Sequence, residues 1–203
     1  MKHKNILLLV DPLNDFADKK GSLYVPDGEK IIPFINELMN DEKFDKIILI
    51  QDWHPENHKS FASNNNAELF SIKEVNGIEQ VMWPKHCVQN TWGAEPHTDL
   101  NIKWDHIVRK GKNLEIDSYS AFYENDGLTK TDIFELFRNL KIRSSDDIYI
   151  VGLATEYCVK YTAIDAKKNH DNVYLFEKGI AGINATDVKS AISEMKNNNI
   201  KLI

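Results

Sequence analysis

Four residues with reactive or charged side chains each follow a short apolar segment of the chain: Asp11, Asp52, Lys110 and Cys158. In an open parallel sheet the carboxyl ends of the strands share one edge, where ligands bind. Polar residues also end strands because strands end at the surface, and for any one of these residues that explanation is the better one. Four together favour one shared crevice that holds two carboxylates, an ammonium group and a thiol.

Cys158 has the sequence setting of a nucleophile. It lies three positions after Thr155, the predicted N-cap of a helix. Unpaired backbone N–H groups and the positive end of the helix dipole stabilise a thiolate there, and a nearby lysine lowers the thiol pKa further. We therefore expect an activated thiol at Cys158, although most cysteines are small buried hydrophobic residues. Cys87 has no such setting and is expected to be structural.

A second group of residues has the chemistry of a metal site. Asp52 and His54 stand two residues apart, which places both side chains on one side of an extended segment, and His86 offers a third donor. One carboxylate with two imidazoles suits a divalent transition ion such as Zn, Fe or Mn, and leaves positions open for water or substrate. An Asp-x-His pattern alone is a weak signal, and His58 could equally be a surface histidine.

The segments that must position these residues alternate between strands and helices. Runs rich in Ile, Leu and Val predict strands at 6–10, 47–50, 106–109, 148–151, 173–176 and 201–203. Apolar residues with helical spacing predict helices around 28–38, 133–140, 155–166 and 188–195. This alternation is typical of an α/β fold with a mainly parallel sheet.

Residues 51–105 depart from this alternation. They contain no convincing strand, yet they include four of the seven histidines. Long excursions inside a compact domain are usually functional. We therefore expect a single domain over 1–203, with the metal site and substrate pocket in an excursion at about 51–105.

Composition excludes several classes of protein. The 203 residues include 31 Asp and Glu against 25 Lys and Arg, a net charge of −6, so no basic surface is expected for nucleic acid. No apolar run is long enough to span a bilayer or to act as a secretory signal, which predicts a cytoplasmic protein that does not bind membranes. Two cysteines cannot form a disulfide framework and are expected to be free thiols.

Several motifs resemble those of the nicotinamidases, in the isochorismatase-like cysteine hydrolase superfamily. The matching segments, in family order, are Asp11 with Asn14-Asp15-Phe16, Gly21-Ser22-Leu23, Gln51 to Phe61, Trp83 to Val88, Lys110-Gly111, Asp117 to Phe122 and Gly152 to Val159. They extend over about three quarters of the chain. The Asp52, His54 and His86 set is the part that resembles the nicotinamidase branch in particular.

The resemblance implies a three-layer α/β/α fold and a catalytic triad. Cys158 would be the nucleophile, Asp11 the proton acceptor and donor, and Lys110 the cation that holds both. The resemblance also implies a cis peptide between Leu153 and Ala154, with the N–H groups of Ala154 and Cys158 as the oxyanion hole. The implied activity is hydrolysis of nicotinamide to nicotinate and ammonia through a Cys thioester, in NAD salvage.

The resemblance further implies one divalent metal ion, zinc first with iron or manganese as alternatives, and a homo-oligomer. Its implied ligands are Asp52, His54 and His86, with His58 as a further ligand or a neighbour of the ligands. The implied walls of the pyridine pocket are Phe16, Trp83 and Tyr119. Two residues depart from the family pattern, Leu13 where Gln is frequent and Glu156 where Asp is usual. Leu13 puts the hydrogen bonding near Asp11 in doubt.

Three other functions compete with this interpretation. The chain could be an isochorismatase-like hydrolase of a different small amide, although the metal set argues against it. It could be a catalytically silent binding protein on the same fold, which would have no need of Asp11, Lys110 and Cys158 at strand ends. A thiol redox protein would use Cys87 and Cys158, but no C-x-x-C pair supports it.

Overall fold

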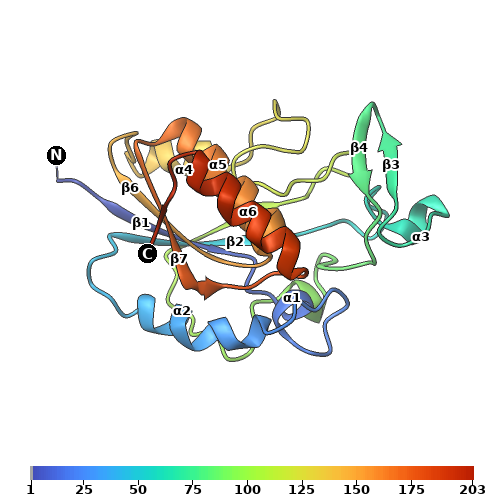
Figure 1. Ribbon diagram of the computed structural model, residues 1–203, viewed down its shortest axis with the longest axis horizontal. Helices are drawn as coiled ribbons and strands as arrows, with labels where there is room; N and C mark the ends of the chain where they lie inside the picture. The colour runs from blue at the N-terminus through green and yellow to red at the C-terminus, as the bar shows by residue number, and fades with distance from the viewer. Residues whose placement is uncertain (1) are drawn as a thin grey trace.

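The computed structural model describes residues 2–203. Its centre is one six-stranded sheet in the order β5-β2-β1-β6-β7-β8 (Figure 1). The strands are β1 (Asn5–Val10), β2 (Lys46–Asp52), β5 (His106–Lys110), β6 (Asp147–Gly152), β7 (Asn172–Ile180) and β8 (Lys201–Leu202). Every neighbouring pair is parallel. The structure thus confirms all six predicted strands.

Helices cover both faces of this sheet, which confirms the three-layer arrangement. One face is covered by η1 (Gly28–Ile31) and α2 (Ile32–Leu38), and the other by α4 (Ile133–Asn139), α5 (Lys160–Asn169) and α6 (Ala185–Asn197). Side chains of β1 alternate between two separate cores: Leu7 and Leu9 pack on the α2 side, while Ile6, Leu8 and Val10 pack on the other. A strand buried on both faces is expected to be apolar, as β1 is from Ile6 to Val10.

The excursion between β2 and β5 contains a hairpin that the sequence analysis did not predict. Strands β3 (Ile72–Val75) and β4 (Ile78–Val81) pair antiparallel and project from the body of the molecule together with α3 (Ala62–Asn65) (Figure 1). The prediction of no strand in 51–105 was therefore wrong. Asn76 and Gly77 join the two strands with φ of 54° and 78°. An Asn-Gly pair with positive φ at both residues is a strong hairpin signal.

The turn that carries Cys158 also differs from the prediction. It is a π-helical turn, η3 (Thr155–Val159), which leads directly into α5. Ala154 occupies the N-cap position, and the buried Oγ1 of Thr155 has no hydrogen-bond partner, so Thr155 is not the N-cap. The Leu153–Ala154 peptide is cis, as the resemblance implied.

Two short elements complete the fold: α1 (Asn14–Ala17) and η2 (Trp92–Ala94), which lie against each other. Within residues 2–203, no helix combines the length and apolar character needed to cross a membrane.

Candidate active site

The four predicted residues meet at the carboxyl edge of four adjacent strands. Asp11 follows β1 directly, Asp52 and Lys110 are the last residues of β2 and β5, and Cys158 lies in η3 after β6. The sheet order β5-β2-β1-β6 makes these strands neighbours. All four side chains are buried, so the predicted crevice is present.

The ammonium group of Lys110 lies at the centre of this group. Its Nζ is 3.0 Å from Oδ2 of Asp11 and 2.5 Å from Oδ1 of Asp52. It also donates to Sγ of Cys158 at 3.4 Å and to the carbonyl oxygen of Ser118 at 3.0 Å. The second carboxylate oxygen of Asp11 accepts from the backbone N–H of Asp52 at 2.8 Å. One buried cation therefore joins the thiol to two carboxylates.

Burial sets the protonation of Asp11 and Cys158. It raises the pKa of Asp11 to about 7, even though Lys110 acts in the opposite direction. It also raises the pKa of the Cys158 thiol well above its usual range, because burial together with Asp11 and Asp52 outweighs Lys110. The expectation of a lowered thiol pKa was therefore wrong. At rest the site holds a protonated thiol beside a carboxylate whose pKa suits proton transfer near neutrality.

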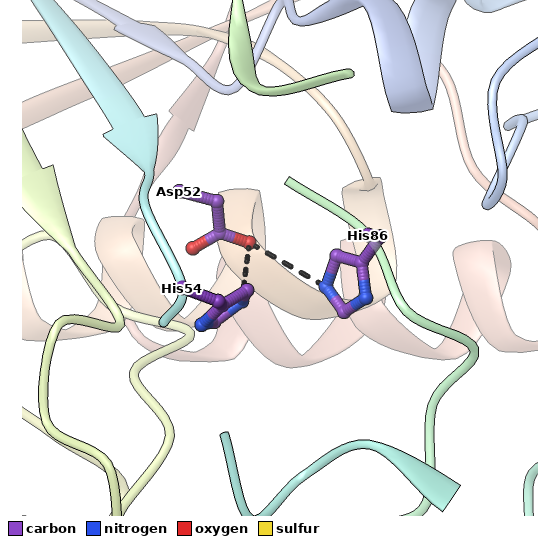
Figure 2. A group of neighbouring side chains, drawn as sticks. All are labelled: Asp52, His54 and His86. Atoms are coloured by element: carbon purple, nitrogen blue, oxygen red, sulfur yellow. Dashed lines mark ion pairs between the residues drawn. The ribbon is translucent and has the colours of Figure 1, made fainter. Parts of the chain in front are cut away.

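The predicted metal ligands also lie together, next to Lys110. Figure 2 shows Oδ2 of Asp52 facing the rings of His54 and His86; the distances from this oxygen to Nε2 of each ring are 3.5 and 3.9 Å. All three side chains are buried. Asp52 thus uses one carboxylate oxygen for Lys110 and the other for the two histidines.

The ring orientation of both histidines suits a metal ion. A carbonyl oxygen can only accept, so Nδ1 of His54 donates to Gly111 at 2.9 Å and Nδ1 of His86 donates to Pro84 at 2.8 Å. Each Nε2 is then directed toward Asp52, the arrangement found in metal-binding histidines. Nε2 of His54 is buried and has no hydrogen-bond partner among residues 2–203. Gly111 has φ of 64°, and a Cβ there would lie 2.4 Å from the His54 ring.

The two rings have different proton affinities. Burial disfavours the charged form of His54, but the Asp52 carboxylate outweighs it and raises the pKa of His54 to about 9. Burial, with the charge of His54, lowers the pKa of His86 to about 4. Burial would also raise the pKa of Asp52, yet Lys110 and His54 hold it well below its usual range. The donors present, one carboxylate and two imidazoles, fit a divalent transition ion.

His58 lies beside this group and is not a surface residue. Its ring is fully buried, 4.4 Å from that of His54 between centroids. Its Nδ1 accepts from the backbone N–H of Ser60 at 3.2 Å and lies 2.7 Å from Oγ of the same serine. An accepting Nδ1 places the ring hydrogen on Nε2, which has no partner among the described residues. In this tautomer His58 is a donor beside the ligands.

A cavity lined by Cys158, Asp52 and His86 opens beside the thiol. The three aromatic residues implied for the pocket, Phe16, Trp83 and Tyr119, all line it. Nε1 of Trp83 donates to the Tyr119 hydroxyl at 3.2 Å, which fixes the two rings relative to each other. The sequence analysis did not predict these further wall residues: Leu23, Val25, Asp117, Tyr157 and Ile183. Leu23, Asp117 and Tyr157 lie within the motifs that carry the family resemblance, a signal that could have identified them.

The two residues that depart from the family pattern leave the triad intact. Leu13 is fully buried in the core on the α2 side, and both carboxylate oxygens of Asp11 still have partners in Asp52 and Lys110. Oε1 of Glu156 accepts from the backbone N–H groups of Ile183 and Asn184, at 2.8 and 2.9 Å. Glu156 therefore connects η3 to the segment before α6 and does not face the reactive thiol.

Known proteins share both the sequence and the fold. Residues 5–203 match the Isochorismatase domain family. A nicotinamidase of Acinetobacter baylyi is 46% identical over 179 residues, covering 86% of this chain and 81% of that protein. The structure titled Acinetobacter baumanii nicotinamidase pyrazinamidease has a TM-score of 0.92 and 39% identity, covering 100% and 97% of the two chains. A pyrazinamidase of Pyrococcus horikoshii, solved in complex with zinc, has a TM-score of 0.79 and 37% identity, covering 98% of each chain. The chain belongs to the isochorismatase family and, within it, to the nicotinamidase branch.

Proposed function

We propose that this chain hydrolyses the amide of nicotinamide, releasing nicotinate and ammonia, as a step of NAD salvage. The observation that carries the proposal is the contact of one thiol, one carboxylate and one ammonium group, Cys158, Asp11 and Lys110, at the floor of an aromatic cavity. The similarity to nicotinamidases supports the choice of substrate. Two free cysteines suit a reducing compartment such as the cytosol.

The first half of the reaction forms a thioester. Asp11 takes the proton of the Cys158 thiol, and the sulfur attacks the carboxamide carbon. Negative charge develops on the amide oxygen as the sulfur attacks. The backbone N–H groups of Ala154 and Cys158 would donate hydrogen bonds to this oxygen, and each such bond is typically worth ~3 to 4 kcal/mol of transition-state stabilisation. As the C–N bond breaks, Asp11 returns the proton to the leaving nitrogen, which departs as ammonia. Lys110 stays charged throughout and stabilises the thiolate.

The second half releases the acid. A water molecule enters the position that ammonia has left, and Asp11 takes one of its protons as the oxygen attacks the thioester carbon. The C–S bond breaks, Asp11 returns this proton to the sulfur, and nicotinic acid leaves with the thiol restored. The free acid then loses its carboxyl proton to water and becomes nicotinate. Asp11 thus acts twice as base and twice as acid, a role for which a pKa of about 7 is well suited.

Binding and orientation come from the cavity walls and the metal-capable group. Phe16, Trp83 and Tyr119 provide apolar faces for a planar ring. A divalent ion held by Asp52, His54 and His86, zinc in our proposal, would supply a Lewis acid for the pyridine nitrogen. This contact would orient the ring and place its carboxamide over Cys158.

Ammonia release from nicotinamide tests the proposal. Cys158→Ala should abolish release while nicotinamide still binds, because the cavity walls and metal ligands are unchanged. Cys87→Ala is the matched control: this cysteine is fully buried outside the cavity, and the variant should retain activity. Removal of metal with a chelator should weaken nicotinamide binding. Near-normal ammonia release by Cys158→Ala would rule out the thioester route, and release from other small amides alone would rule out nicotinamide as the substrate.

A further inference from the structure

One buried carboxylate near the metal-capable group has no role in the function proposed above. Asp117 lines the cavity and is only 3% exposed. Among residues 2–203, its only ionisable partner within 4.0 Å is His54, at 3.9 Å from Oδ1 to Nε2. Among the same residues, the only hydrogen bond that its carboxylate accepts comes from the backbone N–H of Ser118, at 2.7 Å. A buried carboxylate normally has a cation or several donors beside it. The His54 ring is the only cation beside Asp117, and this ring loses its charge when its Nε2 binds a metal ion.

The donors near Asp117 form a second cluster. Asp117, His54 and His58 offer three ligand atoms within 4.8 Å of one another, as do Asp52, His54 and His86. The two clusters share Nε2 of His54, which has a single lone pair, so they cannot each hold an ion at the same time. One ion bound by Asp52, His54 and His86 would therefore leave Asp117 unbound, with its Oδ1 3.9 Å from the shared ligand atom.

Charge also favours a role for Asp117 toward the ion. A divalent ion brings two positive charges to a buried position. Asp52 is the only carboxylate in the first cluster, and its charge is shared with Lys110 at 2.5 Å. Among residues 2–203, Asp117 has no lysine or arginine partner that would draw its charge away in the same manner. Its carboxylate is thus available to balance the remaining charge of the ion.

We propose that Asp117 is a positioning residue of the metal centre, where its carboxylate accepts a hydrogen bond from a water ligand of the ion held by Asp52, His54 and His86. The inference rests on the metal site of the proposed function. Groups that hydrogen-bond the inner ligands of a metal typically change affinity 10- to 100-fold when they are removed.

A metal titration of two variants tests the role of Asp117. Metal-free protein is titrated with ZnCl2 in competition with a chromophoric chelator. Asp117→Asn keeps an oxygen that can accept from Ser118, so the loop retains its hydrogen bond while the charge is lost. We expect zinc to bind this variant about 10- to 100-fold more weakly than the wild type. Glu115→Gln, two residues earlier in the same loop and outside the cavity, should bind zinc as the wild type does.

Thermal unfolding of the metal-free proteins separates this role from a structural one. Asp117→Asn removes a buried charge that has no lysine or arginine partner among residues 2–203 and only His54 at 3.9 Å, so its midpoint without metal should stay close to that of the wild type. A purely structural role would instead lower this midpoint and leave zinc affinity unchanged. Zinc affinity of Asp117→Asn within twofold of the wild type would overturn the inference alone. A wild type that binds no zinc would overturn the inference together with the metal site of the proposed function.

Discussion

Lys110 is the residue on which the electrostatics of the site depend. It is 1% exposed and lies within 3.0 Å of carboxylate oxygens of both Asp11 and Asp52. Two buried carboxylates this close would repel each other without the cation between them. We therefore expect Lys110 to stabilise the fold in addition to its role in the proposed chemistry.

Replacement of Lys110 by Met should destabilise the protein strongly. The variant leaves two carboxylates buried without their cation, a change that typically costs about 3 to 5 kcal/mol. Urea unfolding of metal-free protein measures the loss. Lys112→Met is the control, because the ion pair of Lys112 with Asp132 is exposed and should be worth less than about 1 kcal/mol. Equal losses in the two variants would contradict the central role of Lys110.

The sequence predicted which residues meet in the candidate site better than it predicted the protonation of their side chains. Asp11, Asp52, Lys110 and Cys158 could be identified because strand ends share one edge of a parallel sheet. The pKa of Cys158 could not, because it depends on how completely the folded chain excludes water from the thiol. The function of Asp117 depends on the side chains opposite it, and these come from segments more than fifty residues away.

At the scale of elements, the main strands and helices were predictable because their apolar residues repeat with clear periods. The hairpin of β3 and β4 was missed because only one of its eight strand residues is buried, so it has no apolar alternation. Its turn residues, Asn76 and Gly77, were the available signal. The π-helical turn at Thr155–Val159 has no comparable signal in side-chain pattern, because it is a local change in backbone hydrogen bonding.

Asp15 joins three separate segments of the active-site wall. Oδ1 accepts from the backbone N–H of Ser22 at 2.9 Å, and Oδ2 accepts from that of Cys87 at 2.7 Å. Gly93 lies so close that a Cβ there would meet the Asp15 carboxylate at 2.0 Å. This carboxylate thus connects α1 to the loop that carries the metal ligand His86.

Asp15→Ala should loosen that connection. It leaves two N–H groups without their acceptor, and each unsatisfied buried donor costs about 1 to 3 kcal/mol. We expect lower stability by urea unfolding and weaker zinc binding, because the residue after His86 is released. Asp18→Ala, which removes a carboxylate from the exposed end of the same turn, should change neither by more than about 0.5 kcal/mol. Unchanged zinc binding in Asp15→Ala would contradict the proposed link to His86.

At the scale of the whole molecule, Asp146 joins the amino-terminal end of the sheet on the side opposite the active site. Its carboxylate accepts from the backbone N–H groups of Lys4 and Arg143 and pairs with the Arg143 guanidinium at 2.7 Å. Burial acts to raise the pKa of Asp146, but Arg143 and these N–H groups outweigh it and lower the pKa to about 2.

Asp146 should therefore contribute a pH-dependent part of the stability. A carboxyl group whose pKa is lower in the folded state stabilises above the unfolded pKa of about 4, and this contribution disappears as pH falls toward 2. Asp146→Asn should lose about 2 kcal/mol at pH 7 and progressively less between pH 4 and pH 2. Urea unfolding of both proteins at several pH values measures the difference. A difference independent of pH would contradict this assignment.

Metal binding should stabilise the whole fold. The ligands come from β2 and two loops, so an intact site requires the folded chain, and an ion at one hundred times its Kd adds ~2.7 kcal/mol. For a chain of this length that corresponds to a rise of roughly 5 to 10 °C in the unfolding midpoint. Thermal scans with and without ZnCl2 measure it, and His54→Ala should abolish the shift. A shift that persists in His54→Ala would place the ion elsewhere.

The two oxygens of Asp52 have a consequence for how the halves of the site respond to each other. Oδ1 contacts Lys110, which also contacts the thiol, while Oδ2 faces the histidines. Coupling free energies between two sites are reciprocal. By whatever factor an ion at the histidines changes the affinity of the thiol for a reversible covalent inhibitor, the inhibitor changes the affinity of the histidines for the ion by the same factor. We therefore expect reversible inhibitors of the cysteine and ions at the proposed metal position to alter each other's affinity.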